Sequence, residues 1–358
     1  MDWITTKEAA EIWGITMRRV QALCDNGKIP TATKLGNIWV MPKNTPKPID
    51  GRTKVAKNKH KIYDSIIQKE PITKGWSEDK KCCVTTTNGT KYLLRVTPIS
   101  RYETRKVLFA VMEQVAALGV PMCIPVEFGT CDDGVYSIQS WIDGEDLTDV
   151  LLRLSEAEQY VLGLTAGEIL RKIHTVTTPD IKPEKPDWTE SFDHNTDERI
   201  QKYYDCGVRF DGDECVILYL QRNRHLIENR PCCFQHGDYS LRNIMFENGG
   251  LKIIDFSRLF IGDPWEDFWY TMLEMAENPY FSTGKLRGYF GGEPPIEFFK
   301  TYAFYILSSF LPGIYESVSL GQDEINKMTK QTQNILAWFN DLNNPVPSWY
   351  LKDWRVEG

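Results

Sequence analysis

Apolar positions near the start of the chain recur at helical spacing behind a helix start signal. Thr5 and Glu8 form a capping box, in which each side chain satisfies a backbone donor of the other residue. Apolar side chains follow as far as Trp13, and Gly14 can end the helix because glycine readily adopts the left-handed conformation of a C-cap. The pattern predicts one short amphipathic helix before Gly14.

A second helix and a strand pair are predicted directly after the first helix. The second helix runs over residues 16–25 with Arg18 and Arg19 on its outer face, and alternation over residues 32–41 indicates two short strands. Two helices joined by a tight turn and followed by a two-stranded wing form a winged helix-turn-helix plan. We therefore predict a small module over residues 1–43.

A linker and a β-rich segment are predicted next. Residues 44–62 are rich in Pro and Lys and poor in apolar side chains, which is typical of an extended linker. An Asn-Gly pair at 88–89 between two strand-like runs predicts a hairpin, and Arg95 lies on its second strand. A helix over 100–118 and a strand over 135–141 follow this hairpin.

Helical patterns dominate much of the rest of the chain. A capping box at Ser155 and Glu158 opens a helix that reaches His174. Two further helices, over 294–315 and 322–342, are rich in Phe, Tyr and Leu. We expect these helices to form a platform that shapes a binding pocket.

The stretch over residues 233–268 carries the candidate chemistry. An Asn-Gly-Gly turn between two apolar runs predicts a hairpin, and folding it about Gly249 places Asn243 opposite Asp255, with Cβ atoms roughly 5 Å apart. One carboxylate and one amide oxygen at that spacing suit Mg²⁺. Asp238 lies on the loop that leads into the hairpin. Phosphoryl transfer needs such a carboxylate together with metal ligands.

The order of these motifs resembles the aminoglycoside phosphotransferase family. The motif H-G-D-x-x-x-x-N ends at Asn243, and the next apolar strand ends in Asp-Phe at 255–256. G-D-P-W-E-D begins at Gly262, and the helix before the catalytic segment ends in Ile-His at 173–174. The resemblance extends from Ile72 to the C-terminus.

The resemblance implies an α+β fold with two lobes, like that of protein kinases, preceded here by the winged helix-turn-helix module. A small β-rich N-lobe and hinge would occupy residues 63–143. A helical C-lobe with the catalytic loop and acceptor site would occupy residues 144–358. The implied reaction transfers the γ-phosphate of ATP or GTP to a hydroxyl of a small molecule, with Mg²⁺ as cofactor.

The resemblance also implies roles for individual residues. Asp238 is expected to be the catalytic base, and Asn243 and Asp255 are expected to hold Mg²⁺. His236 and Asp263 are expected to support the catalytic loop. Nucleotide binding is expected of four residues, through side chain or backbone: Ser77, Arg95, Ser140 and Ile142.

The chain departs from the family pattern at the phosphate-binding cation. Arg95 stands where kinases usually carry Lys, which keeps the charge but replaces a compact ammonium with a planar fork. The helix position expected to carry its Glu partner resembles Leu108. Glu103 and Glu113 are five residues from that position and point elsewhere on a helix. The partner of Arg95 therefore stays open.

The region after Asp267 is expected to determine the acceptor. Acidic and aromatic side chains recur there at helical spacing, some as core and some able to line a pocket for a cationic substrate. Residues 61–358 contain 31 Lys+Arg and 44 Asp+Glu. A polycationic aminoglycoside is therefore the first acceptor to test, with macrolides, amino alcohols, amino acids and sugars left open. The candidate acceptor residues are Glu266, Trp269, Tyr270 and Glu274.

The N-terminal region differs in charge from the rest of the chain. Residues 1–60 contain 11 Lys+Arg and 5 Asp+Glu. The first 43 residues resemble excisionase and MerR-like winged helices, which implies that Arg18, Arg19 and Lys28 approach DNA phosphates. Contact with another protein is the alternative role for this module.

Composition favours a reduced, cytoplasmic protein. The chain has 358 residues and a net charge of −7. Nine cysteines without a C-x-x-C indicate free thiols, and the five scattered histidines suggest no zinc site. The longest apolar stretch is too short and too interrupted to span a bilayer, and no secretory signal pattern is evident. We expect no membrane partner.

Two other functions compete with a small-molecule kinase. A transcriptional regulator could use a kinase-like domain as a ligand sensor, which the N-terminal module and the missing helix Glu would suit. Retention of Asp238, Asn243 and Asp255 argues against it. A protein kinase is disfavoured because the chain has H-G-D for H-R-D, D-F-S for D-F-G and no A-P-E.

Overall fold

The computed structural model of the chain forms two compact units, residues 1–60 and residues 61–358. None of the helices in the described part of the chain is long and apolar enough to cross a membrane. The structure describes residues 3–26, 29, 31–36, 38–43, 45, 61–73, 79–176, 188–258 and 260–355, apart from the side chains of 35, 188–194 and 270.

The first unit contains, in chain order, β1 (Trp3–Thr5), α1 (Thr6–Trp13), α2 (Met17–Asp25), β2 (Thr33–Leu35) and β3 (Ile38–Pro42). The capping box is present, because Glu8 N donates to Thr5 Oγ1 (3.4 Å) and Thr5 N donates to Glu8 Oε2 (2.7 Å). The predicted strand pair gains a third strand, since β1 pairs with β3 in the order β1-β3-β2. The winged helix-turn-helix assignment stays a prediction.

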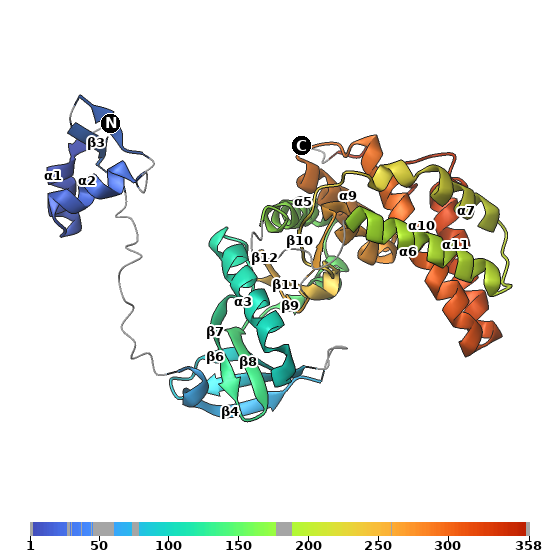
Figure 1. Cartoon of the computed structure of the whole chain (residues 1–358), viewed down its shortest axis with the longest axis horizontal. Helices are drawn as coiled ribbons and strands as arrows, with labels where there is room; N and C mark the ends of the chain where they lie inside the picture. The colour runs from blue at the N-terminus through green and yellow to red at the C-terminus, as the bar shows by residue number, and fades with distance from the viewer. Residues whose placement is uncertain are drawn as a thin grey trace. The chain divides into compact units, whose positions relative to one another are not determined.

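The second unit begins with a five-stranded antiparallel sheet in the order β4-β5-β6-β8-β7, and α3 packs against β7 and β8 (Figure 1). The predicted Asn-Gly hairpin joins β5 to β6, with Gly89 at φ 81°. Val84, Leu94 and Ile138 are buried in the core of this sheet. The elements are β4 (Ile66–Pro71), β5 (Lys80–Thr86), β6 (Lys91–Thr97), α3 (Tyr102–Ala117), β7 (Pro125–Cys131) and β8 (Gly134–Ser140).

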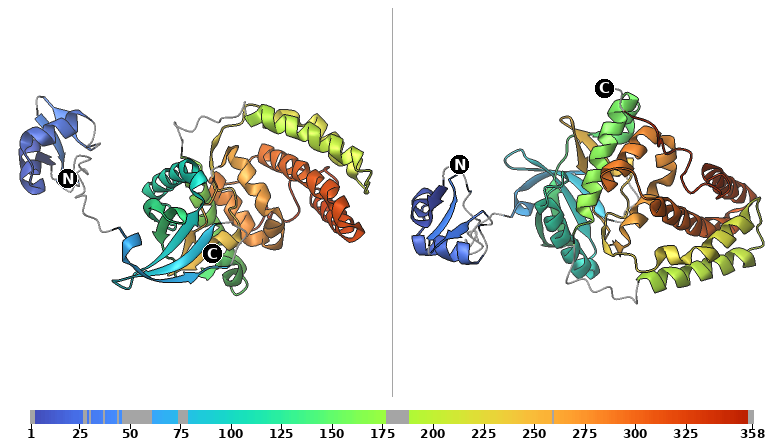
Figure 2. Two further views of the ribbon diagram at one scale, coloured as in Figure 1. Left: turned by 60° about the horizontal axis from the view of Figure 1, so that its bottom comes forward. Right: turned by 90° about the horizontal axis from the view of Figure 1, so that it is seen from above.

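Helices form most of the remaining lobe (Figures 1 and 2). One large apolar core joins these helices to α3 and to the small sheet near the catalytic segment. The helices are α4 (Leu147–Leu151), α5 (Glu156–Ile173), α6 (Trp188–Asp205), α7 (Asp213–Arg222), α8 (Met272–Glu277), α9 (Pro279–Phe290), α10 (Ile296–Ser317) and α11 (Gln322–Trp338). Short 3₁₀ helices are η1 (Tyr63–Ser65), η2 (Ile99–Arg101), η3 (Arg224–Ile227), η4 (Leu241–Asn243), η5 (Pro264–Thr271) and η6 (Val318–Leu320).

Short strands of the helical lobe frame the catalytic segment. Three of them form a sheet in the order β12-β11-β9, and two form the antiparallel pair β10 and β13. The loop between β10 and β11 is therefore fixed at both ends by strand pairing. Their bounds are β9 (Glu145–Asp146), β10 (Cys233–Gln235), β11 (Ile244–Glu247), β12 (Gly250–Ile253) and β13 (Phe260–Gly262).

The hairpin of β11 and β12 is paired one residue away from the predicted register. Asn243 lies opposite Ile254, whose N–H donates to the Asn243 carbonyl at 2.9 Å, and not opposite Asp255. The reason is the turn: Asn248 and Gly249 both have positive φ, 51° and 79°, and form a two-residue turn. The prediction had centred an odd-length turn on Gly249 and is wrong by one position.

Helices α5 and α9 approach each other at backbone contact distance. Their facing positions are glycines, Gly163 and Gly167 on α5 and Gly284 and Gly288 on α9. A Cβ at Gly167 would overlap the carbonyl of Lys285, and a Cβ at the other three positions would overlap a backbone carbonyl in the same way. Because these four glycines have no Cβ, α9 can lie directly against the backbone of α5. Helix α9 is buried over residues 281–289.

Candidate active site

One cavity of about 980 Å³ collects the predicted catalytic residues. Asp238, Asn243 and Asp255 all line it, together with Arg95 from β6 and the hinge segment 140–144. The lining comes from both lobes, since β6 belongs to the five-stranded sheet and the three catalytic candidates belong to the helical lobe. These predicted residues thus converge on a single site.

The predicted catalytic loop, between β10 and β11, is held by a buried carboxylate that sequence reasoning did not single out. Asp267 accepts from the backbone N–H groups of His236 (2.8 Å) and Gly237 (2.7 Å), and lies 3.1 Å from His174 Nε2. Burial alone would raise the pKa of the Asp267 carboxyl, but the hydrogen bond and charge of His174 hold it below its usual value. The carboxylate therefore stays ionised and fixes the start of the loop.

The prediction that Asp263 supports the catalytic-loop backbone is wrong. Asp263 instead begins η5, where it accepts from Trp265 N at 3.0 Å, and it pairs with Arg230 at 2.6 and 3.0 Å. Its carboxylate is thereby directed toward the helix start, and Asp267, one turn later, faces the loop. The second aspartate of G-D-P-W-E-D, Asp267, was the signal that could have identified this role.

Three further side chains hold the rest of the loop. Asn243 Nδ2 donates to the Asp238 carbonyl at 2.9 Å, and Lys285 Nζ donates to the Tyr239 carbonyl at 3.1 Å. Both carboxylate oxygens of Glu274 lie 2.9 Å from the backbone nitrogen of Leu241, whose N–H donates to them. Glu274, predicted for the acceptor pocket, is therefore a support of the catalytic loop.

Lys285 is a buried cation that no sequence pattern had marked. Burial lowers its pKa to about 8, while the negative charges of Glu274, Asp267 and Asp238 oppose the shift. Its ammonium also lies over the Tyr239 ring, 4.9 Å from the centroid. It sits on α9 among the glycine contacts, so its position under the loop depends on tertiary packing that local sequence does not reveal.

His236 joins the catalytic loop to the end of β12. Its Nε2 lies 3.0 Å from the Ile254 carbonyl, and its ring packs edge-on against Phe256, with centroids 4.7 Å apart. Burial lowers the pKa of His236, so the ring is neutral at physiological pH. A neutral ring that donates through Nε2 fits the bracing role expected from the sequence.

Asp255 reaches the cavity through an unusual backbone conformation. It follows β12 with φ 63°, and this left-handed conformation redirects the chain after the strand. Asn243 lies opposite Ile254, and side chains alternate between the two faces along a strand. If the strand continued in regular conformation, the Asp255 side chain would therefore lie on the face opposite to that of Asn243. Both nonetheless line the same cavity.

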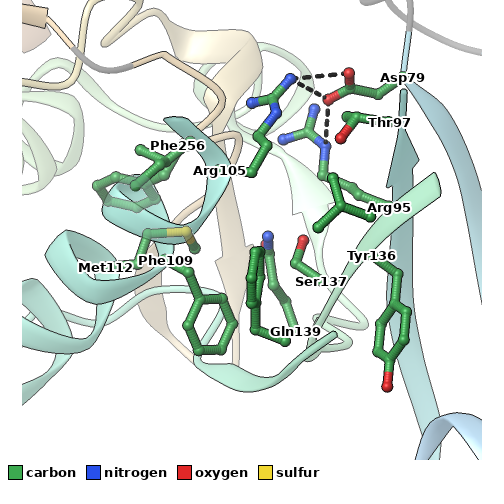
Figure 3. A pocket seen from close by; sticks show the side chains of 13 residues that line it. Asp79, Arg95, Thr97, Arg105, Phe109, Met112, Tyr136, Ser137, Gln139 and Phe256 are labelled. Carbon is green, nitrogen blue, oxygen red and sulfur yellow. Dashed lines mark hydrogen bonds and ion pairs between the residues drawn. The ribbon is translucent and has the colours of Figure 1, made fainter. Parts of the chain in front are cut away.

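Arg95 is paired with two aspartates, of which Figure 3 shows Asp79. Its Nη2 lies 2.7 Å from Asp255 Oδ1, and its Nε lies 3.5 Å from Asp79 Oδ2. Burial alone would raise the pKa of Asp255, but the Arg95 guanidinium holds it below its usual value. Leu108, at the helix position where a Glu was expected, is buried in the apolar core.

The family model of the phosphotransferase enzyme family (APH) matches residues 69–299. The chain belongs to this family. The match begins beyond the first unit, so it carries no information on residues 1–60. A search of curated proteins finds no match.

Solved structures of phosphotransferases share the fold of this family member. Because their identities lie below 25%, the likeness shows the fold alone, and it confirms the predicted sheet lobe and helical lobe. The GDP complex of wild-type aminoglycoside 2'-phosphotransferase-IIIa has a TM-score of 0.55 and 16% identity, and the match covers 78% of this chain and 94% of that chain. The gentamicin–APH(2")-IIa complex has a TM-score of 0.54 and 18% identity, with 75% of this chain and 91% of that chain covered. Amicoumacin kinase hAmiN in complex with AMP-PNP, Ca²⁺ and Ami has a TM-score of 0.53 and 14% identity, with 78% of this chain and 90% of that chain covered.

The predicted hinge of this phosphotransferase-family chain is partly engaged by its own sheet. Ser140 and Ile142 line the cavity. The Ser140 N–H donates to the Ile124 carbonyl at 2.8 Å, and the Ser140 Oγ accepts from the Ile124 N–H at 2.8 Å. The backbone donor of Ser140 is thus used within the protein. Ser77, predicted to bind nucleotide, lies outside the described residues.

The remaining predicted residues lie away from the cavity or outside the described part of the chain. Glu266 accepts from Gln235 Nε2 at 3.2 Å, and Trp269 packs against the large core; neither lines the cavity. Arg18 and Arg19 lie on α2 of the first unit, where DNA binding stays a prediction. The Tyr270 side chain and Lys28 fall outside the described residues.

Proposed function

We propose that the second unit is a small-molecule O-phosphotransferase that uses ATP or GTP and Mg²⁺. The observation that carries this proposal is the convergence of Asp238, Asn243 and Asp255 with Arg95 in one cavity. Membership of the phosphotransferase family supports the reaction class. An aminoglycoside-like antibiotic is the first acceptor to test.

In the proposed reaction Asp238 handles the acceptor proton. The acceptor oxygen forms a bond to the γ-phosphorus, the bond to the β–γ bridging oxygen breaks, and the hydroxyl proton passes to the Asp238 carboxylate. Products are the phosphorylated acceptor and the nucleoside diphosphate. The loop contacts from Asp267 and Lys285 hold Asp238 in place, so that little rearrangement is needed during the reaction.

The donor set near the hairpin fits Mg²⁺. Asp255 offers a carboxylate and Asn243 an amide oxygen, because the Asn243 Nδ2 is engaged by the Asp238 carbonyl. Magnesium binds few protein ligands and keeps waters or phosphate oxygens in its shell. Bound there, the ion would neutralise phosphate charge.

The cavity is also suited to a polyanionic nucleotide. Its described lining contains more cationic side chains than carboxylates, which favours the triphosphate. Ile142 and Leu93 are the apolar candidates for contact with the base. The charged lining residues are Lys81, Arg95, Arg101, Arg105, Arg242, Arg258, Asp143, Asp146, Asp238 and Asp255.

The acceptor is proposed from fold relatives and charge. The structural neighbours include complexes with gentamicin, streptomycin and Ami, each a statement about that protein. The excess of 44 Asp+Glu over 31 Lys+Arg in residues 61–358 favours a cationic acceptor. Macrolides, amino alcohols, amino acids and sugars are the alternatives for the same site.

Mass spectrometry of an acceptor panel tests the proposal. The protein is incubated with Mg²⁺, ATP or GTP, and aminoglycosides, macrolides, amino alcohols, amino acids and sugars. A compound that gains one phosphate in a nucleotide-dependent manner supports the assignment and identifies the acceptor class. A protein that binds neither nucleotide contradicts the proposal.

A further inference from the structure

Asp79 occupies a position that is unusual for a carboxylate. It directly precedes β5, its side chain is 2% exposed, and it lies between two guanidinium groups. Both of its oxygens accept from Arg105 Nη2 at 2.9 Å, and its Oδ2 lies 3.5 Å from Arg95 Nε (Figure 3). A carboxylate this buried is tolerated only when it is paired and hydrogen-bonded.

Arg105 connects this carboxylate to two other parts of the site. It lies on α3, and its Nη1 donates to the Ser257 carbonyl at 2.7 Å, two residues beyond Asp255. Charged hydrogen bonds thereby join helix α3 to the start of β5 and to the segment after Asp255. The ion pair of Arg95 with Asp79 joins the middle of β6 to them. The helix contributes a cation to this set, and the strand segment contributes the carboxylate.

The surroundings of Arg95 show that its orientation is specified. Its side chain is 6% exposed, and one face borders a small cavity beside the buried polar side chains of Thr97 and Gln139 (Figure 3). Asp79 holds the Nε side of the guanidinium, while Nη2 reaches Asp255 at the large cavity. The Arg95 guanidinium is therefore held by Asp79 on its Nε side, and its Nη2 side is directed into the large cavity.

We infer that Asp79 and Arg105 are positioning residues for the phosphates of the nucleotide. Asp79 orients Arg95 toward the phosphates, and Arg105 holds Asp79 against α3. The sequence led us to expect an acidic partner for Arg95 on the helix. Instead, the helix carries the cation Arg105, and the acidic partner Asp79 lies beside the strand. The inference rests on the proposed function, because it requires a nucleotide in the large cavity. Asp79 does not line that cavity, whereas Arg105 does, so Asp79 is the residue whose effect must pass through Arg95.

A positioning role and a purely structural role predict different binding behaviour. If Asp79 acts through Arg95, its loss weakens only ligands that carry phosphates. If it only stabilises the sheet lobe, its loss weakens a nucleoside and a nucleoside triphosphate alike, or weakens neither. The two roles are therefore separated by comparing ATP with adenosine, or GTP with guanosine if the wild type binds GTP.

Calorimetry measures the dissociation constants of the nucleoside triphosphate and of its nucleoside. The full-length proteins compared are the wild type, Asp79→Asn, Arg105→Met, Arg95→Met and the double variant Asp79→Asn with Arg95→Met. Asp133→Asn is the matched control, because it removes one exposed carboxylate from the turn between β7 and β8 of the same sheet. Thermal unfolding of each variant checks the fold. Arg105→Met serves as the second variant if Asp79→Asn does not fold.

The inference predicts that Asp79→Asn weakens triphosphate binding by roughly tenfold or more and leaves nucleoside binding unchanged. Arg105→Met shows a smaller loss with the same dependence on phosphate. In the Arg95→Met background, Asp79→Asn has no further effect on the triphosphate, because the residue through which it acts is absent.

Equal losses for nucleoside and triphosphate overturn the inference, as does an undiminished effect of Asp79→Asn in the Arg95→Met background. Wild-type binding of the triphosphate by both folded Asp79→Asn and folded Arg105→Met also overturns it. In each of these cases the proposed function stands, because the wild type binds nucleotide. Failure of the wild type to bind ATP or GTP is a different result, which removes the proposed function and this inference with it.

Discussion

At the scale of single residues, the candidate site depends on backbone groups that side chains hold in place. Asp267 holds the start of the catalytic loop, Asn243 and Lys285 hold carbonyls in its middle, and Glu274 holds its end. Charged hydrogen-bond partners are about twice as strong as neutral ones, and they act here where water has little access. The geometry of Asp238 is therefore set by residues on η4, η5, α8 and α9.

Loss of Asp255 should remove the contribution of magnesium to nucleotide binding. In the wild type we expect Mg²⁺ to strengthen ATP or GTP binding, because the ion would join phosphate oxygens to Asp255 and Asn243. In Asp255→Ala, calorimetry with and without Mg²⁺ should give the same dissociation constant. A full magnesium effect in this variant would show that the ion is held elsewhere.

Lys285→Met should slow turnover more than it changes nucleotide binding. The variant removes the donor to the Tyr239 carbonyl beside Asp238, and a displaced catalytic group typically costs roughly tenfold to a hundredfold in kcat. Steady-state kinetics and nucleotide dissociation constants measure the two effects separately. Lys330→Met, at an exposed position on α11, is the control. Wild-type kcat in a folded Lys285→Met would contradict a loop-supporting role.

Asp267 should make the stability of the fold depend on pH in the acid range. Its pKa is lower in the folded chain than the usual value of 3.8, so it contributes stability that is present above that value and is lost as pH falls through the folded pKa. Asp267→Asn should therefore lower the free energy of unfolding by about 2 kcal/mol at neutral pH.

Urea denaturation across the range from neutral to acid pH checks the Asp267 prediction. The difference in unfolding free energy between wild type and Asp267→Asn should shrink as pH falls below about 4, because the wild-type carboxyl then becomes protonated. A difference that stays constant over the whole range would show that the charge of Asp267 does not contribute.

At the scale of elements, the helix pair α5 and α9 carries the loop supports. The glycine contacts let α9 lie against α5, and this position delivers Lys285 to the Tyr239 carbonyl. Tyr239 in turn donates through its hydroxyl to the Ala166 carbonyl of α5 at 2.8 Å. The catalytic loop is thus attached to both members of the pair.

Gly167→Ala should destabilise the helical lobe although alanine is the better helix former. The added Cβ would overlap the Lys285 carbonyl, and overpacking of this kind costs roughly 1–3 kcal/mol, more than the gain of about 1 kcal/mol in helix propensity. Chemical denaturation measures the change. Gly250→Ala is the matched control, since the nearest atom to its added Cβ is 3.8 Å away. Equal stability of Gly167→Ala and wild type would contradict backbone contact between the helices.

At the scale of the whole molecule, sequence reasoning succeeded where the signal was a spaced motif. The catalytic segment from His236 to Asp255 converges on one cavity because its residues are close in sequence and joined by one hairpin. The two-lobed fold is confirmed by the family and its structural neighbours. The hairpin register was wrong because two positive-φ residues form a shorter turn than the one assumed.

Contacts between distant segments were not readable from the sequence. Asp79 pairs with Arg95 and Arg105 across three elements, and nothing in its local pattern marks it as their partner. Lys285 resembles an ordinary helix residue until the glycine packing of α9 is known. The second aspartate of G-D-P-W-E-D was visible, yet its role required knowing which aspartate caps the helix and which one faces the loop.

The most direct test of the account compares phosphate transfer by wild type and Asp238→Ala at equal nucleotide occupancy. Mass spectrometry follows the acceptor found in the panel, and calorimetry confirms that both proteins bind the nucleotide. The account predicts that the phosphorylated product forms with the wild type and is absent or severely reduced with Asp238→Ala, while nucleotide binding is retained. Normal turnover by Asp238→Ala would contradict the central claim that this carboxylate accepts the acceptor proton.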